Sequence, residues 1–141
     1  MDSFTYPALF EPQPEGGFTV TFRDIPEAIT QGDDRAEAEA MARDALVTAM
    51  DFYFEDGRTV PAPSKARKGE DPVELPVSVA AKVALLNLLR ERKERPADLA
   101  RAMGIRPQEI TRVLDLHHAT KIDTLADAFR AMGKRLDLRV V

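Results

Sequence analysis

The chain has 141 residues, 44% of them hydrophobic, which is enough for one domain or for two small domains with packed cores. It contains no Cys, so disulfides and thiolate metal sites are excluded and a reducing compartment is expected. We find neither a signal peptide nor a run of about 18 apolar residues, and therefore expect a soluble, cytoplasmic protein that does not enter a membrane.

The net charge of −4 hides an asymmetry along the chain. Residues 1–62 contain 13 Asp and Glu but 4 Lys and Arg, a net charge of −9. Residues 63–141 contain 16 Lys and Arg but 11 Asp and Glu, a net charge of +5. An acidic half suits a basic partner and a basic half suits nucleic-acid phosphates, although small domains also drift in charge without any such role.

The first third of the chain carries strand patterns. Apolar residues alternate over residues 4–10 and 18–22, and a turn rich in Pro and Gly separates the two segments, which predicts a hairpin. A short extended segment at about residues 28–30 follows. Residues 73–77 can add one more strand after the helix that comes next.

That helix is predicted between Asp34, a candidate N-cap with Glu37 three residues later, and Gly57. Its expected inward face has helical spacing and consists of Ala38, Met41, Ala42, Ala45, Ala49, Phe52 and Tyr53. The elements together give the order β-β-β-α-β. We therefore predict an α+β protein whose N-terminal domain comprises residues 1–62 plus the strand at 73–77.

The second half has a different character. Residues 63–72 are rich in Pro and charge and are predicted to be a linker or an exposed loop. Four helices are then expected over residues 78–141, which begin near Ser78, Pro96, Pro107 and Thr120. Alternating apolar residues at 136–141 allow a terminal strand, so this domain is all-α apart from that strand.

Residues 96–112 are the most informative segment. Two short helices flank Gly104, which suits the left-handed backbone of a tight turn. The apolar wedge between them would consist of Leu99, Met103, Ile105 and Ile110. This spacing resembles the helix-turn-helix of the phage-repressor class of DNA-binding proteins. A small helical bundle without a DNA role is the alternative.

In a helix-turn-helix the second helix enters the major groove with its N-terminal residues against base edges. Gln108 and Arg112 are the predicted base contacts, because Gln reads adenine and Arg reads guanine through paired hydrogen bonds. Arg106 and Thr111 can equally contact phosphates, and Glu109 can accept from cytosine or pair with an Arg. An ordinary solvated helix face is the alternative for each of them.

His117, His118 and Lys121 follow this helix and are predicted to contact phosphates, with a purely structural role in the loop as the alternative. Adjacent His residues do not readily share a metal ion. We also find no Ser-His-Asp order and no phosphate-binding loop, and most acidic residues fit helix caps or solvated faces. We therefore expect neither a catalytic residue, a metal site nor a cofactor.

Three segments resemble one family. Residues 14–32, 44–63 with DFYFEDG and 108–123 with LHHATKID are similar to the longer, helix-turn-helix form of the HicB antitoxins. The resemblance implies an N-terminal domain like a partial ribonuclease H fold that masks HicA, a small basic RNase toxin that cleaves mRNA. It also implies a C-terminal domain that binds operator DNA as a dimer and represses its own operon.

Phe54, Glu55 and Asp56 are our candidates for toxin contact, because acidic side chains attract a basic RNA-binding partner. Phe52 and Tyr53 are weaker candidates, since both can belong to the core instead.

Residues 136–141 can pair across a two-fold axis in a homodimer or a higher oligomer, or else pack on their own domain. A ligand-sensing transcription regulator and an enzyme fused to a DNA-binding module are the competing functions.

Overall fold

The structure is a computed structural model that describes residues 4–141. The chain divides into two compact units, unit 1 up to Pro76 and unit 2 from Val77 onwards. Among the described residues no helix combines the length and the apolar character needed to cross a membrane. Residues 63–72, expected as a linker or exposed loop, lie within unit 1.

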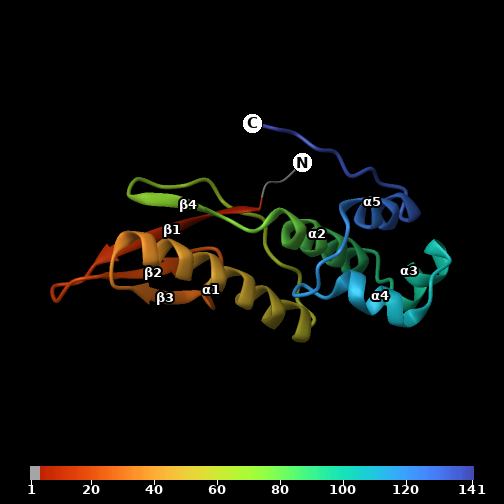
Figure 1. The fold of residues 1–141 in the computed structure, drawn as a ribbon, viewed down its shortest axis with the longest axis horizontal. Coiled ribbons are helices and arrows are strands. Elements are labelled where there is room, and N and C mark those ends of the chain that lie inside the picture. Colours follow the sequence, from red (N-terminus) through yellow and green to blue (C-terminus); the bar gives the residue numbers. More distant parts are fainter. Residues whose placement is uncertain (1–3) are drawn as a thin grey trace. The chain divides into compact units, whose positions relative to one another are not determined.

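Unit 1 has the predicted element order β-β-β-α-β. Its elements are β1 (Thr5–Pro12), β2 (Phe18–Phe22), β3 (Ile29–Gly32), α1 (Arg35–Glu55) and β4 (Glu70–Glu74). The strands form one antiparallel sheet in the order β3-β2-β1-β4 (Figure 1). β4, the last strand of unit 1, therefore pairs with β1, the first strand.

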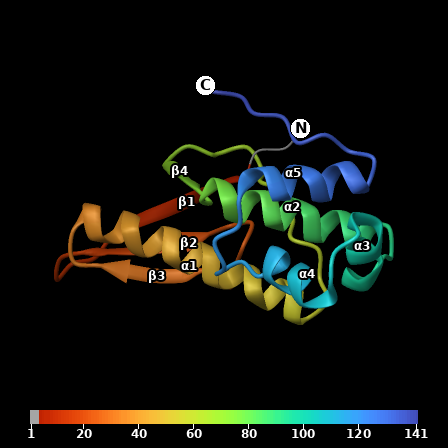
Figure 2. The same ribbon diagram turned by 45° about the vertical axis from the view of Figure 1, so that its right-hand side comes forward.

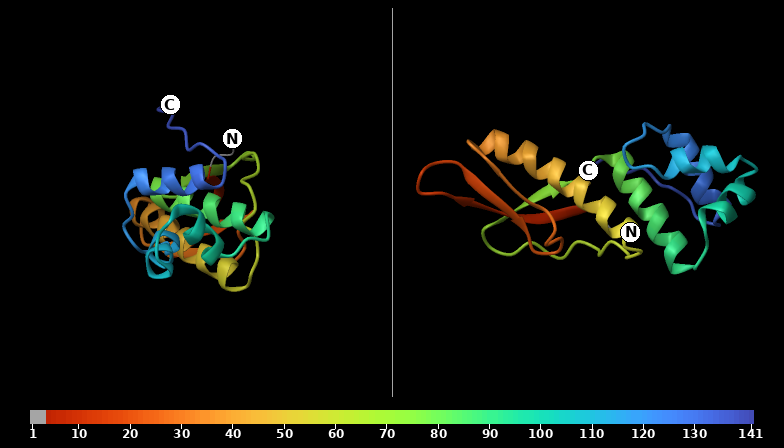
Figure 3. Two further views of the ribbon diagram at one scale, coloured as in Figure 1. Left: turned by 90° about the vertical axis from the view of Figure 1, so that its right-hand side faces the viewer. Right: turned by 90° about the horizontal axis from the view of Figure 1, so that it is seen from below.

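One face of this sheet is covered by α1 (Figure 3). The alternation predicted for the hairpin is confirmed, because the buried side chains of its strands include Tyr6, Ala8, Phe10, Val20 and Phe22. α1 buries mostly small residues against the sheet, among them Ala38 and Ala42. A Cβ atom added at Gly32 would lie 2.4 Å from the backbone N of Ala38, so helix and strand are in near contact there.

The predicted ends of α1 are confirmed. The Asp34 side chain accepts a hydrogen bond from the backbone N–H of Glu37 at 2.8 Å. Gly57 follows the helix with φ of 71°, in the left-handed region. The inward face is wrong at two positions, because Met41 and Phe52 are 40% and 47% exposed.

The last strand of unit 1 lies three residues before its predicted position. β4 pairs with β1 from Glu70 opposite Leu9 to Glu74 opposite Thr5, and residues 75–77 lie outside the strand. The apolar alternation over residues 73–77 predicted the wrong bounds for this strand. β4 is an edge strand, and such a strand is held by its main-chain hydrogen bonds and tolerates charge and Pro in its sequence.

Unit 2 consists of α2 (Val77–Glu91), α3 (Pro96–Met103), α4 (Pro107–Leu114) and α5 (Ile122–Ala131) (Figure 2). α2 begins one residue before the expected cap at Ser78. Its residues Leu85 and Leu89 join Leu125 and Phe129 of α5 in one hydrophobic core, which α3 and α4 complete.

The strand predicted for residues 136–141 is not formed within this chain. Leu138 and Val140 are 81% and 93% exposed. Alternation gives a segment the propensity for a strand, but a strand also needs a hydrogen-bonded neighbour, and the described residues provide none here. The alternative of a strand packed on its own domain is therefore wrong, although Leu136 at the start of the segment packs against the core of unit 2.

Candidate functional site

Two short helices of unit 2 meet at a tight turn, as the sequence predicts. α3 ends at Gly104, whose φ of 70° lies in the left-handed region, and α4 begins at Pro107, which has no N–H that would need a partner. The residues of the predicted wedge all belong to or pack against one hydrophobic cluster: Leu99, Met103, Ile105 and Ile110.

The predicted contact residues of α4 lie on its solvent side. All five are exposed: Arg106, Gln108, Glu109, Thr111 and Arg112. Gln108 and Arg112 are four positions apart and so lie on neighbouring turns of one helix face. The Thr111 hydroxyl donates to the Pro107 carbonyl at 3.0 Å, which occupies its only hydrogen.

The turn after α4 presents both histidines to solvent while Leu116 is buried. The Asp115 carboxylate accepts from the His117 N–H at 2.9 Å, and the Asp115 carbonyl accepts from the His118 N–H at 3.1 Å. Lys121 is exposed at the N-cap of α5. The eight predicted DNA contacts thus follow one another along α4 and the turn after it.

Lys82 of α2 is the one charged residue that is buried in the described part of the chain, with an exposed fraction of 0%. Its Nζ donates to the carbonyls of Asp115 at 2.6 Å and His118 at 2.5 Å, and lies 3.5 Å from that of Arg112. Burial lowers the pKa of this amine, and the charge of Asp115 opposes that shift. Sequence reasoning assigned it no role, although a lone Lys within the apolar run 79–86 is a usable signal.

The predicted toxin contacts lie at the C-terminal end of α1. Glu55 is exposed, Phe54 is half-buried, and Asp56 forms an ion pair with Arg58 at 3.2 Å. An exposed ion pair of this kind adds little to stability, so a basic partner can replace Arg58 beside Asp56 at little cost. The carboxylates of Glu55 and Asp56 are both accessible to such a partner.

The two neighbouring aromatic residues differ from each other. Tyr53 belongs to the core, and its hydroxyl donates to the Glu27 carboxylate at 2.7 Å. Burial and this carboxylate raise the pKa of Tyr53 to about 12. Phe52 is 47% exposed, so the core alternative is confirmed for Tyr53 and wrong for Phe52.

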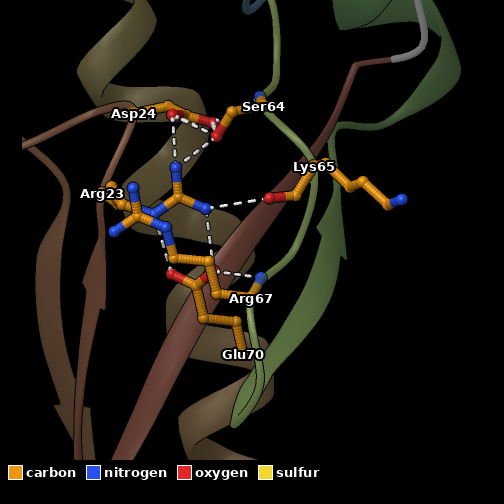
Figure 4. A network of polar contacts seen from close by, with 6 residues as sticks. All are labelled: Arg23, Asp24, Ser64, Lys65, Arg67 and Glu70. Carbon is orange, nitrogen blue, oxygen red and sulfur yellow. Dashed lines mark hydrogen bonds and ion pairs between the residues drawn. The ribbon is translucent and has the colours of Figure 1, made fainter.

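A polar network in unit 1 was not predicted (Figure 4). The Arg23 guanidinium donates to both Glu70 carboxylate oxygens, at 2.8 and 3.1 Å, and to the Ser64 hydroxyl. Asp24 accepts from the backbone N–H and the hydroxyl of Ser64 at 2.8 and 2.7 Å. Glu70 also accepts from the Arg67 N–H at 2.7 Å. These bonds fasten residues 64–70 to the end of β2.

The hydrogen bonds from Arg23 and from the Arg67 backbone lower the pKa of Glu70 to about 2. The network joins residues 40 or more positions apart, and the pairing of β4 with β1 brings them together. No local sequence pattern signals it.

No three His, Asp or Glu side chains of residues 4–141 form a group that could hold a metal ion. Asp24, Glu27 and Glu70 are instead engaged with Arg, Tyr or backbone N–H groups.

Comparison with known proteins gives matches over nearly the whole chain. A family model described as the HicB-like antitoxin of bacterial toxin–antitoxin systems matches residues 5–84. Antitoxin HicB 2 of Photorhabdus laumondii is 58% identical over 133 residues, which is 94% of each chain. Antitoxin HicB of Escherichia coli is 51% identical over 136 residues, 96% of this chain and 99% of the relative. Because the family model matches more than half of the chain and the relatives align with it across both units, the chain belongs to the family of HicB-like antitoxins.

Proposed function

We propose that this chain is a cytoplasmic, non-enzymatic antitoxin that masks a HicA-type, mRNA-cleaving RNase toxin and represses its own operon by binding operator DNA. The observation that carries the proposal is the similarity to proteins named antitoxin HicB, which extends across both units. The charge distribution agrees with it. Unit 1 contains 16 Asp and Glu with 7 Lys and Arg, a net charge of −9, whereas unit 2 has a net charge of +5.

Unit 1 is the proposed toxin-binding part, with a partial ribonuclease H-like fold. Its acidic contacts are Glu55 and Asp56, and Phe54 adds an apolar contact. Replacing both acids by Lys should weaken toxin binding, measured by calorimetry, and leave the circular dichroism spectrum unchanged. The matched control is Glu11→Lys with Glu15→Lys, which makes the same charge change at exposed positions of the β1–β2 region. Equal affinities for both double variants would discard Glu55 and Asp56.

Unit 2 is the proposed DNA-binding part, with α3 and α4 as a helix-turn-helix. Gln108 and Arg112 are proposed to read bases, while Arg106, His117, His118 and Lys121 contact phosphates. Thr111 is a weaker candidate than before, because its hydroxyl hydrogen is already donated to Pro107. Glu109 accepts from cytosine or pairs with an Arg.

Arg112→Ala should lower operator affinity by about 1–3 kcal/mol if this residue makes a paired contact with guanine. The measurement is a binding titration with operator DNA and with random-sequence DNA of equal length. An equal loss on both would assign Arg112 to a phosphate.

We propose that residues 136–141 pair with a second copy across a two-fold axis, which would match two operator half-sites. The exposed Leu138 and Val140 support this, because neither has a place in the core of its own chain. Deletion of this segment should halve the mass measured by light scattering if a dimer is the parent state. A deletion variant of unchanged mass would place the dimer contact elsewhere.

A further inference from the structure

The last turn of α4 and the turn that follows it are held from the side by a single side chain of another helix. Lys82, from the middle of α2, brings its ammonium group to three main-chain carbonyls, those of Arg112, Asp115 and His118. Two of these distances, 2.6 Å to Asp115 and 2.5 Å to His118, are short hydrogen bonds. The Lys82 side chain that makes these three contacts is completely buried.

The chemistry of an ammonium group fits this position. It has three N–H donors and no acceptor, so it can serve three converging carbonyls without leaving a polar atom unsatisfied. The carbonyls at the end of a helix lack partners within the helix and carry partial negative charge, which a cation stabilises. A guanidinium, which is planar and larger, does not match three carbonyls that meet at one point.

The held segment carries the proposed DNA contacts. Arg112 belongs to the last turn of α4, and its carbonyl also accepts from the Asp115 N–H at 3.2 Å. His117 and His118 are exposed residues of the turn that follows α4, and Lys82 donates hydrogen bonds to main-chain carbonyls of this turn. Asp115 and His118 therefore each have their backbone fixed both by the turn itself and by α2.

We propose that Lys82 is a positioning residue for DNA recognition, which sets the end of α4 and the 115–118 turn in the geometry that binds operator DNA. This inference rests on the proposed DNA-binding function of unit 2. Lys82 itself is buried and does not touch DNA. It acts through Arg112 and the two histidines, whose side chains depend on the backbone that it holds.

A purely structural role makes a different prediction. A variant that only destabilises unit 2 lowers the folded fraction and so weakens binding to every DNA equally. Loss of positioning instead lowers affinity for the operator more than affinity for random DNA, because base contacts need accurate geometry and phosphate contacts need less of it. The ratio of the two affinities therefore separates the two roles.

The experiment uses the full chain and two duplexes of equal length, the DNA upstream of its own gene and a random sequence. Lys82→Met, which keeps the length of the side chain but has no donor, should lower the affinity ratio about tenfold, similar to the effect of a mismatched base pair. Leu85→Val, a buried core change on the same helix, should leave the ratio unchanged. Lys134→Met, an exposed lysine of unit 2, controls for the lost charge.

Hydrogen exchange gives a readout without DNA. The N–H groups of Asp115 and His118 donate to the carbonyls of Arg112 and Asp115, which are two of the acceptors of Lys82. Both should exchange faster in Lys82→Met than in Leu85→Val at equal global stability. Lys82→Arg should restore neither the exchange rates nor the affinity ratio, because a guanidinium restores the positive charge but cannot donate to all three converging carbonyls.

An affinity ratio in Lys82→Met equal to that of the parent protein would overturn the proposal. Full rescue by Lys82→Arg would also overturn it, since charge alone would then suffice. If the parent protein binds both duplexes equally, the DNA-binding function and the positioning role both fail, and the exchange rates then show only a structural contact. A lowered ratio with faster exchange supports the proposal.

Discussion

Unit 1 and unit 2 both hold a non-repetitive segment through hydrogen bonds between side chains and its main chain, but these side chains lie in different surroundings. In unit 1 the Arg23 network lies near the surface, and the side chains of Arg23 and Glu70 are 27% and 11% exposed. In unit 2 the single ammonium of Lys82 is completely buried. Solvent and salt screen charges near a surface far more than buried ones. The network should therefore respond to salt and pH, whereas Lys82 should not respond to salt.

The largest loss of stability is expected at a site that belongs neither to the Arg23 network nor to the contacts of Lys82. Gly32→Ala would place a Cβ atom 2.4 Å from the backbone N and 2.6 Å from the Cα of Ala38. Because backbone atoms cannot give way cheaply, we expect unit 1 to lose about 3 kcal/mol or more of stability in urea unfolding. Gly16→Ala is the control, since only the strain of its φ of 100° opposes it. If the two variants lose equal stability, α1 and β3 do not approach each other as closely at Gly32 as the structure shows.

Removal of the buried ammonium should have the next largest effect. Lys82→Met leaves the His118 carbonyl without its donor and should destabilise unit 2 by about 1–3 kcal/mol. This loss should be the same at about 0.1 M and about 1 M salt, because the contact is shielded from ions. Urea unfolding at both salt concentrations measures it. A loss that disappears in high salt would mean that the ammonium is hydrated and the comparison between the units is wrong.

A helix cap is a third kind of main-chain support and should be weaker. Asp34→Ala removes the acceptor of the Glu37 N–H and should lower the stability of unit 1 by about 1 kcal/mol. Asp34→Asn retains an acceptor and should recover most of that loss. Thermal unfolding followed by circular dichroism distinguishes the three proteins, and identical midpoints would show that the cap contributes nothing.

The smallest effect, and the one that depends on pH, is expected at Glu70. Its pKa is about 2 in the folded state and near 4.5 when unfolded, so the stabilisation is fully present above pH 4.5 and is lost as the pH falls toward 2. Glu70→Gln should therefore show a flatter loss of stability between these pH values. Glu74→Gln, in the same strand, is the matched control. A profile for Glu70→Gln that parallels the parent protein would remove Glu70 from the network.

Local patterns were sufficient for the elements whose cause is local. The hairpin alternation, the Asp34 cap and the turns at Gly57 and Gly104 are each set by a few neighbouring residues, and the structure has them where they were predicted. The family and the exposed side of α4 were also accessible from the sequence.

The errors concern features that depend on distant parts of the chain. The position of β4 follows from pairing with β1, since Pro and charge dominate its own sequence. Met41 and Phe52 are exposed because the buried stripe of α1 runs through Leu46 and Met50 instead. Lys82 and the Arg23 network join residues 30 or more positions apart, and no spacing rule connects them.

The most direct test of the central claim is co-purification of this chain with the tagged product of the small gene next to its own, followed by an RNase assay. We predict a stable complex without RNase activity and an active RNase once the partner is freed from it. A complex that cleaves RNA as fast as the freed partner, or the absence of any complex, would contradict the antitoxin function.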